Sequence, residues 1–314
     1  MTTSSDYSFL SNENDIINDA FTKIGIHFPG ETIPAENYDF ARRQLNRMIK
    51  FWARNQHLWI MRAGTLLLEN GVNTYTLDST AARWTDTMRD TTLTAAGAAL
   101  ATSLTVASTT GMTVGDAIGV ILTSKVIHWT TIATIPNATS LTITTGLATA
   151  AANGNRVYTY TTRAQPPIRI EWIVRRSSDD IDVELAQLSR KDYDTLPSKT
   201  LAGLPVAYYY DPKITNGTLY LYQTPDDPKV TLQITYRRQI QDMDTTTQTI
   251  EFPIEWEDCI VHNLAIRLAP LGGIGLDDPL FVQIQQIAVD ELRSLAFHDD
   301  DNMSMQLDID DTGD

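Results

Sequence analysis

Apolar residues recur at helical spacing near both ends of the chain. Residues 15–24 carry them at intervals of three and four, which predicts an amphipathic helix that ends at Gly25. A second predicted helix begins at Pro34, and its apolar stripe consists of Tyr38, Ala41, Leu45, Met48 and Trp52. Two more are predicted from Pro253 to Pro270 and, after the capping residue Asp278, from Pro279 onward, the last with the stripe Phe281, Ile284, Ala288, Leu292 and Leu295. We therefore expect the two ends of the chain to share one core.

Between these ends, short runs of β-branched and aromatic residues predict strands. Residues 206–210 and 218–222 are typical of a hairpin, with Asn216-Gly217 as a type I′ turn. Ile168, Ile170, Trp172 and Val174 alternate against Arg169, Glu171 and Arg175, which predicts a strand whose apolar face turns to the core. A short helix is predicted from Glu184 to Leu196.

Composition shifts sharply at about residue 91. From there to residue 160 the chain is rich in Thr and Ala, and its charged residues are Asp116, Lys125 and Arg156. Four short runs within it, at residues 104–106, 118–122, 126–129 and 141–143, predict strands, and Gly and Asn punctuate them. This segment is predicted to be a small inserted all-β module whose neutral surface suits contact with another subunit.

The predicted fold class is α+β: a helical bundle formed by the N- and C-terminal segments, plus a central antiparallel β domain carrying the inserted module. The predicted parts are an N-terminal helical part at 1–60, a central β domain at 61–90 and 161–253, the inserted module at 91–160, C-terminal helices at 254–298 that complete the bundle, and an acidic tail at 299–314.

Charge limits the partners of this chain. Its net charge of −15 disfavours binding of nucleic acid through phosphate neutralisation, although DNA could pass such a surface without adhering. Residues 1–6 lack the basic and apolar regions of a signal peptide, and no apolar run reaches the ~20 residues that span a bilayer. Cytosolic synthesis without membrane insertion is expected, and Cys259 is expected to be a buried, inert thiol.

Two segments have polar patterns that allow two interpretations each. Arg43, Arg47, Lys50 and Arg54 form a basic stripe that is either a solvated helix face or a contact with an acidic face of a neighbouring subunit. The tail from Asp299 onward is acidic, and its apolar residues Met303, Met305, Leu307 and Ile309 alternate with polar ones. This pattern indicates either disorder or binding to a partner, by strand addition or by insertion into a groove on assembly.

Patterns for catalysis are weak. The chain has neither a P-loop nor a GxGxxG motif, its histidines lack metal-ligand spacing, and no cofactor or metal is expected. Asp258 and His262 lie at i, i+4 and are interpreted as a solvated pair. Glu255, Glu257 and Asp258 are interpreted as first-turn acids that stabilise a helix, rather than as the acid and base of a glycan hydrolase. We therefore expect a protein that is not an enzyme.

The helical ends also carry a family resemblance. The run from Asp15 to Ile26, followed by Gly30-Glu31, by Gln44 to Met48 and by Trp52, resembles the N-terminal pattern of head-to-tail connectors of short-tailed bacteriophages. These proteins are also called adaptors, tail accessory factors or tail tubular A-type proteins. Residues 205–210 and 252–270 are similar to later parts of the same family, whereas residues 91–160 lie outside its compact pattern.

This resemblance implies a structural virion protein at the head-tail junction, synthesised in the host cytoplasm. It implies a ring, typically of about twelve copies, that binds the portal protein above and a tail nozzle or tail fibres below. Such a ring joins capsid to tail, retains packaged DNA and forms part of the ejection channel, so that double-stranded DNA passes through without specific binding. The last helix and tail would bind the portal, through Phe281, Ile284, Leu292, Leu295, Met303, Met305, Leu307 and Ile309.

Two other functions stay open. One is a virion-associated hydrolase of cell-wall peptidoglycan that uses Glu255 or Glu257, and the other is a tail adhesin whose 91–160 segment binds glycans.

Overall fold

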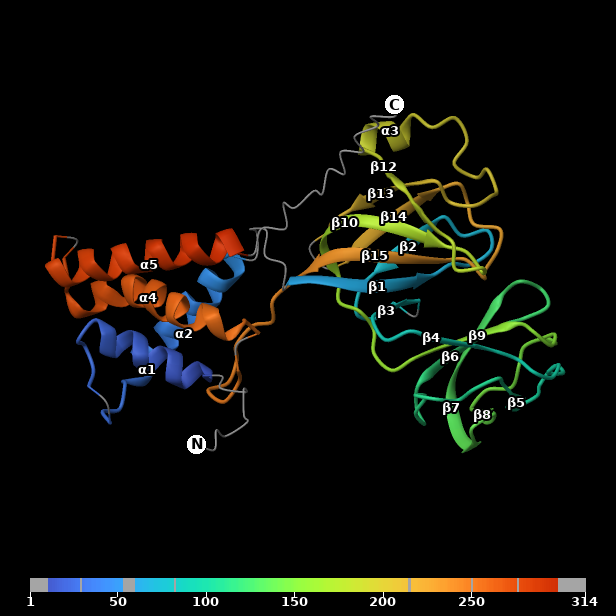
Figure 1. Cartoon of the computed structure of the whole chain (residues 1–314), viewed down its shortest axis with the longest axis horizontal. Coiled ribbons are helices and arrows are strands. Elements are labelled where there is room, and N and C mark those ends of the chain that lie inside the picture. Colours follow the sequence, from blue (N-terminus) through green and yellow to red (C-terminus); the bar gives the residue numbers. More distant parts are fainter. Residues whose placement is uncertain are drawn as a thin grey trace, which may run out of the picture. The chain divides into compact units, whose positions relative to one another are not determined.

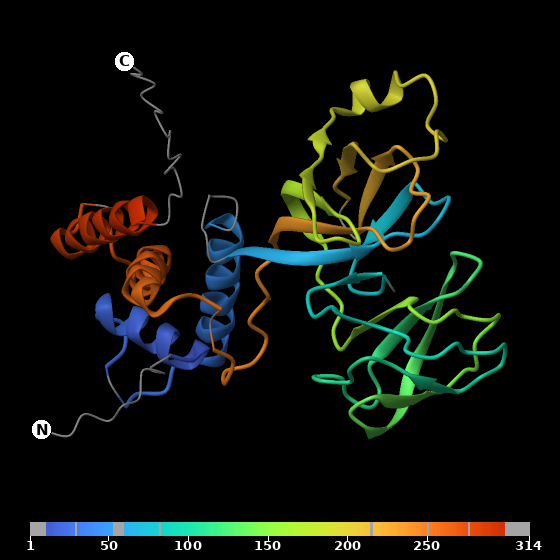
Figure 2. The same cartoon turned by 45° about the vertical axis from the view of Figure 1, so that its right-hand side comes forward.

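The computed structural model describes residues 11–28, 30–52, 60–81, 83–213, 216–249, 251–275 and 277–298. The chain divides into two compact units (Figure 1 and Figure 2). The helical unit consists of Met1–Ile60 and Ile240–Asp314, and the β unit consists of Met61–Gln239.

In its described part, the helical unit contains α1 (Glu13–Lys23), α2 (Ala35–Trp52), η2 (Ile254–Trp256), α4 (Glu257–Leu268), η3 (Ala269–Gly272) and α5 (Pro279–His298). Both ends of the chain contribute to one hydrophobic core, in which α4 contacts α1, α2 and α5. Leu264 and Leu268 of α4 are fully buried, and Trp256 packs against Trp52 with ring centroids 5.9 Å apart. The helices predicted near both ends are therefore confirmed.

Local caps fix the ends of these helices. Asn12 and Asp15 form a capping box at the start of α1. At its end, Gly25 has a φ of 70°, the amide of Ile26 donates to the carbonyl of Phe21, and that of Gly25 donates to Thr22. This is the Schellman pattern, which requires the left-handed conformation that glycine adopts without strain.

The β unit contains two sheets besides a third that is described below. The first has the order β11-β10-β15-β1-β3, with β1 (Met61–Leu67), β3 (Trp84–Thr85), β10 (Pro167–Arg176), β11 (Asp182–Glu184) and β15 (Thr231–Arg238). The second has the order β12-β13-β14-β2, with β2 (Thr74–Leu77), β12 (Ala186–Gln187), β13 (Ala207–Asp211) and β14 (Gly217–Tyr222). One cluster joins residues of both sheets, including Leu66 and Ile234 of the first and Tyr208 and Leu219 of the second. The pairings are antiparallel except β12 with β13, which confirms the central antiparallel β domain.

Strand β10 departs from the simple alternation. Ile170 and Ile173 are buried, whereas Ile168 is 40% and Trp172 is 44% exposed. The register of β10 against β15 shifts between Pro167 and Arg169 and again between Ile170 and Trp172. Each bulge inserts an extra residue and moves the following side chains to the opposite face. The prediction that Ile168 and Trp172 face the core is therefore wrong.

Residues 89–160 form a closed six-stranded sheet, which we call the barrel. Its order is β4-β9-β6-β7-β8-β5, with β4 (Arg89–Thr92), β5 (Ser103–Thr105), β6 (Ala117–Ile121), β7 (Ile127–Asn137), β8 (Ser140–Ile143) and β9 (Arg156–Tyr160). A bridge between Leu93 and Val106 closes the sheet, and the amide of Thr94 donates to the carbonyl of Thr105 at 3.0 Å. This bridge brings the ends of the two edge strands, β4 and β5, together and protects them from pairing with another chain. The strands predicted in this segment are confirmed.

Two local predictions fail where tertiary pairing takes over. The helix predicted from Glu184 to Leu196 is reduced to α3 (Arg190–Asp194), because the amides of Leu185 and Ala186 donate to Ile173 and Val206 in neighbouring strands. Gly217 does not form a type I′ turn, since it pairs with Leu77 inside β14. The ring of Tyr210 occupies the space that a Cβ at Gly217 would need.

Candidate interaction surfaces

The basic stripe lies on the outer face of α2. Arg43 and Arg47 are exposed, and Lys50 is exposed and forms an ion pair with Asp242 at 2.5 Å. Arg54 lies outside the described residues. Phe51, four residues after Arg47, is 60% exposed on the same side of the helix. The structure thus adds an aromatic ring to a face that the sequence pattern described by its charge alone.

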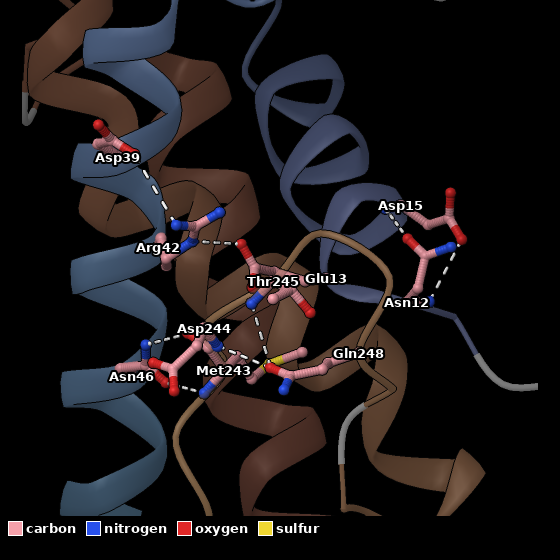
Figure 3. A network of polar contacts seen from close by, with 10 residues as sticks. All are labelled: Asn12, Glu13, Asp15, Asp39, Arg42, Asn46, Met243, Asp244, Thr245 and Gln248. Carbon is pink, nitrogen blue, oxygen red and sulfur yellow. Dashed lines mark hydrogen bonds and ion pairs between the residues drawn. The ribbon is translucent and has the colours of Figure 1, made fainter.

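A different arginine of α2 points inward and joins α2 to α1. Nε of Arg42 donates to Oε1 of Glu13 at 2.7 Å, and the Glu13 side chain is fully buried. The Arg42 guanidinium also lies 5.4 Å from the ring centre of Tyr38. Burial, followed by the charge of Glu13, raises the pKa of Tyr38 to about 12. Figure 3 shows Arg42 directed toward Glu13 of α1, so this arginine belongs to the internal structure of the unit. Arg43 and Arg47, by contrast, are exposed.

The segment before α4 is bound to α1 and α2 by polar contacts (Figure 3). The Asn46 side chain accepts from the amide of Met243 and donates to its carbonyl, both at 3.0 Å. Oε1 of Gln248 accepts from the amides of Asp244 and Thr245, while the Gln248 carbonyl accepts from the amide of Glu13. Beside this segment lies a cavity of about 390 Å³, lined in part by these residues.

Four of the eight side chains predicted to bind a portal pack within the protomer. Phe281 and Ile284 are 7% and 5% exposed, and Leu292 and Leu295 pack against the same helical core. Their helical spacing is that of a core-facing stripe. The other four predicted contacts, Met303, Met305, Leu307 and Ile309, lie outside the described residues.

Helix α5 instead exposes apolar side chains on both flanks of its buried stripe. Leu280 and Ile287 lie seven residues apart on one flank, and Val282 and Val289 lie seven apart on the other. Their exposed fractions are between 38% and 52%. Exposed aliphatic side chains in two rows are typical of a helix that gains neighbours on assembly. Helical periodicity alone missed these rows because they flank the core stripe that it detects.

A cleft of about 360 Å³ between α1 and α4 is lined by acidic residues, including Asp19, Glu257 and Asp258, and by Lys23. Burial, then the charges of Asp258 and Asp19, raises the pKa of Glu257. Burial and the charge of Asp15 raise the pKa of Asp19. Glu255, the other residue of the hydrolase alternative, is exposed. Within the part of the chain that the structure describes, no three His, Cys, Asp or Glu side chains gather as metal ligands.

The interpretation of Asp258 and His262 as a solvated pair is wrong. His262 is 7% exposed, and its Nδ1 lies 2.9 Å from Oε2 of Glu291 on α5. The nearby Cys259 is buried, as predicted, and burial raises its thiol pKa to about 12. The thiol is therefore protonated and unreactive at neutral pH. None of the described helices is long and apolar enough to cross a membrane.

The exposed aliphatic rows of α5 and the exposed basic residues of α2 are features that favour assembly with partners. The family model of the SU10 adaptor protein matches residues 128–306, more than half of the chain. The chain therefore belongs to the SU10 adaptor protein family and is a structural protein of a bacteriophage.

Other comparisons add little. No curated protein matches this sequence. Among solved structures, VP17, a capsid protein of bacteriophage P23-77, aligns over 60% of this chain and 77% of its own, with 10% identity. Its TM-score of 0.13 is too low to support any conclusion about the fold.

Proposed function

We propose that this protein is a head-to-tail adaptor that forms a ring under the portal and joins the capsid to the tail. The observation that carries the proposal is the adaptor family match, which includes the last three strands of the barrel, the later strands of the β unit, α4 and α5. In this role about twelve copies surround the path of double-stranded DNA, help to retain the packaged genome, and line part of the ejection channel. The portal binds on one side and a nozzle or tail fibres on the other.

The net charge of −15 supports a DNA path without adhesion. Repeated around a ring, this charge repels the phosphate backbone and favours passage over binding. The charge has a second consequence. An acidic neighbour is an attractive partner for the outward Arg43 and Arg47, so a contact between copies can use the basic stripe.

The rows on α5 give the proposed ring its apolar contacts. Leu280 and Ile287 occupy one flank, Val282 and Val289 the other, and each copy in a ring has one neighbour on each side. In this arrangement the buried stripe, with Phe281 and Ile284, positions α5 within the protomer. Contact with the portal then falls to residues 299–314.

The test is assembly with the purified portal protein of the same phage, observed by electron microscopy and mass photometry. The wild-type protein is expected to form rings on the portal. The double variant Arg43→Glu/Arg47→Glu is expected to lose them, because each copy then presents acidic side chains to an acidic neighbour.

The matched control is Arg190→Glu/Lys191→Glu, which makes the same change in charge on the exposed residues of α3. Normal rings with the α2 variant would show that the stripe is only solvated. Absence of any ring or portal complex with the wild-type protein would contradict the adaptor proposal itself.

A hydrolase function has one observation in its favour, the raised pKa of Glu257 in an open cleft. It predicts that the protein clears a suspension of purified cell walls and that Glu257→Gln abolishes the clearing, with Asp226→Asn, an exposed acid of the β unit, as the control. No clearing by the wild-type protein rules this function out.

A further inference from the structure

Three tyrosine rings lie together on the outer face of the second sheet of the β unit. Tyr209 of β13 and Tyr220 of β14 are directly opposite each other across the strand pair, with ring centroids 5.7 Å apart and an interplanar angle of 19°. Tyr193 of α3 packs on both, at 6.0 Å and 5.4 Å. The three rings line a cavity of about 320 Å³, which we call the tyrosine cleft.

Strand alternation explains why Tyr209 and Tyr220 lie outside the core, whereas Tyr193 of α3 is itself 6% exposed. Tyr208 and Tyr210 point inward and are 1% and 9% exposed, so Tyr209 between them points outward. Leu219 and Leu221 are fully buried on β14, which turns Tyr220 to the same outer face. The core thus needs neither Tyr209 nor Tyr220, and a solvent-exposed pair of strands could carry smaller side chains there.

The rim of the cleft carries charges of both signs that already compensate each other. Asp194 lies 3.8 Å from Nε of Arg190 and 3.7 Å from Nζ of Lys199. Asp211 lies 3.6 Å from Nζ of Lys213. Nζ of Lys199 also lies 5.1 Å from the ring centre of Tyr193.

This charge pattern excludes several ligand classes. A cationic ligand would compete with Lys199, which already occupies the cation site over Tyr193. An anionic ligand, including single-stranded nucleic acid, would meet the carboxylates of Asp194 and Asp211 instead of a basic groove. The ligand class that fits the cleft is therefore a neutral one. Such a ligand has an apolar face that packs against the rings, and polar groups that both donate and accept hydrogen bonds.

Sugars have both properties. The C–H bonds of a pyranose ring lie against the negative face of an aromatic ring, and its hydroxyls donate to carboxylates and accept from guanidinium and ammonium groups. The cleft volume is at the lower end of the range for small-molecule sites, which suits a short saccharide. We propose that the tyrosine cleft binds a neutral saccharide. The proposal does not depend on the adaptor function, and it places the glycan site in the central sheet instead of residues 91–160.

The test uses the full-length protein and three neutral probes, namely maltotriose, cellotriose and triacetylchitotriose. Ligand-observed saturation-transfer NMR detects binding, and calorimetry measures its affinity. At least one probe is expected to bind. Tyr220→Ala is expected to weaken that binding at least tenfold, because it removes one ring of the stacked pair.

Two further variants keep the result interpretable if Tyr220→Ala disturbs the sheet. Arg190→Ala changes only an exposed rim residue, and it is expected to weaken binding severalfold without changing the melting temperature. Tyr222→Ala is the matched control, since Tyr222 lies on the same strand, two residues from Tyr220, and does not line the cleft. Its affinity is expected to equal that of the wild type.

Two results would overturn the proposal. One is the absence of transfer signal from all three saccharides at millimolar concentration. The other is binding that Tyr220→Ala and Arg190→Ala both leave unchanged, or that Tyr222→Ala weakens as much as they do.

Discussion

The helical unit and the barrel cover their cores in opposite ways. The outer face of the helical unit carries charged side chains, such as Arg43, Arg47 and the ion pair of Lys50 with Asp242. The barrel instead presents mostly neutral hydroxyls, and those of Thr131 on β7 and of Thr144, which follows β8, lie 2.8 Å apart. The helical core also joins segments from both ends of the chain, whereas the barrel core comes from consecutive residues. One surface therefore responds to charge and salt, and the other offers hydrogen bonds and shape.

The largest expected effect tests whether the helical core depends on contacts between the two ends of the chain. Trp256→Ala removes a buried ring that packs on Trp52 and Phe252. We expect a loss of roughly 3–5 kcal/mol in unfolding free energy, since the cavity adds to the lost transfer free energy. Hydrogen exchange with mass spectrometry should show faster exchange in α1, α2 and α4 and unchanged exchange in the barrel.

The control is Leu271→Ala, because Leu271 is 42% exposed. This variant should change neither the free energy of unfolding nor the exchange rates by much. Equal acceleration of exchange in the barrel would break the comparison, because the two cores would then unfold together.

The second prediction tests the packing of the barrel. A Cβ at Gly119 would lie 2.8 Å from Ile127 and from Trp129, both on the adjoining strand β7. Gly119→Ala is therefore expected to lower the free energy of unfolding by about 1–3 kcal/mol, because the added methyl group overpacks the barrel. Thermal unfolding followed by circular dichroism measures the loss, and Gly275→Ala, where a Cβ meets nothing within 4 Å, is the control. A neutral result at Gly119 would show that the barrel is looser than its contacts indicate.

The third prediction concerns the polar segment of the helical unit. Asn46→Ala removes both side-chain hydrogen bonds to Met243. It should lower the free energy of unfolding by about 1–2 kcal/mol, since each bond contributes about 1 kcal/mol. Urea denaturation measures it, with Gln44→Ala on the same helix as the control. Residues 243–249 should exchange faster in the Asn46 variant alone, and protection equal to that of the wild type would contradict the structural role of Asn46.

The smallest expected effect depends on pH. The folded-state pKa of Glu257 is raised, so the protonated group stabilises the fold at low pH, and this contribution is lost as pH rises through the folded pKa. Glu257→Gln should therefore raise the melting temperature by about 1 °C at neutral pH and leave it unchanged below about pH 4. Scanning calorimetry at both pH values measures this, with Glu255→Gln as control. A lower melting temperature at neutral pH would mean that Glu257 makes a favourable contact.

Helical periodicity predicted the helical unit well because its signal is local and its caps are explicit. Asn12 and Gly25 bound α1, and Asp278 accepts a hydrogen bond from the amide of Leu280 at the start of α5. In the β unit, the sequence signal is the alternation of apolar and polar residues with a period of two. One inserted residue moves all the following side chains to the opposite face of the sheet. The bulges of β10 therefore turned Trp172 outward, although its sequence position indicated the core.

The candidate sites were harder to predict than the elements. Apolar spacing detected the core stripe of α5 and missed Ile287 and Val289 on its flanks, because a periodic pattern detects the face that is buried. No sequence pattern predicted the tyrosine cleft. Tyr209 and Tyr220 come together through the pairing of β13 with β14, and Tyr193 joins Tyr209 through the position of α3. The basic residues Arg43 and Arg47 were found because their charge contrasts with an acidic chain.

The neighbouring positions of β4 and β9 determine how easily the barrel can be replaced by another segment of chain. The chain enters the barrel on β4 and leaves it on β9, and these strands pair directly, with Arg89 opposite Thr159. A segment whose two ends are already side by side can be cut out and replaced by a turn or by another domain, while the sheets on either side keep their connection. The barrel is therefore a segment that can be exchanged as a whole. Such an exchange would change one surface of this protein and preserve the sequence and fold of its helical unit.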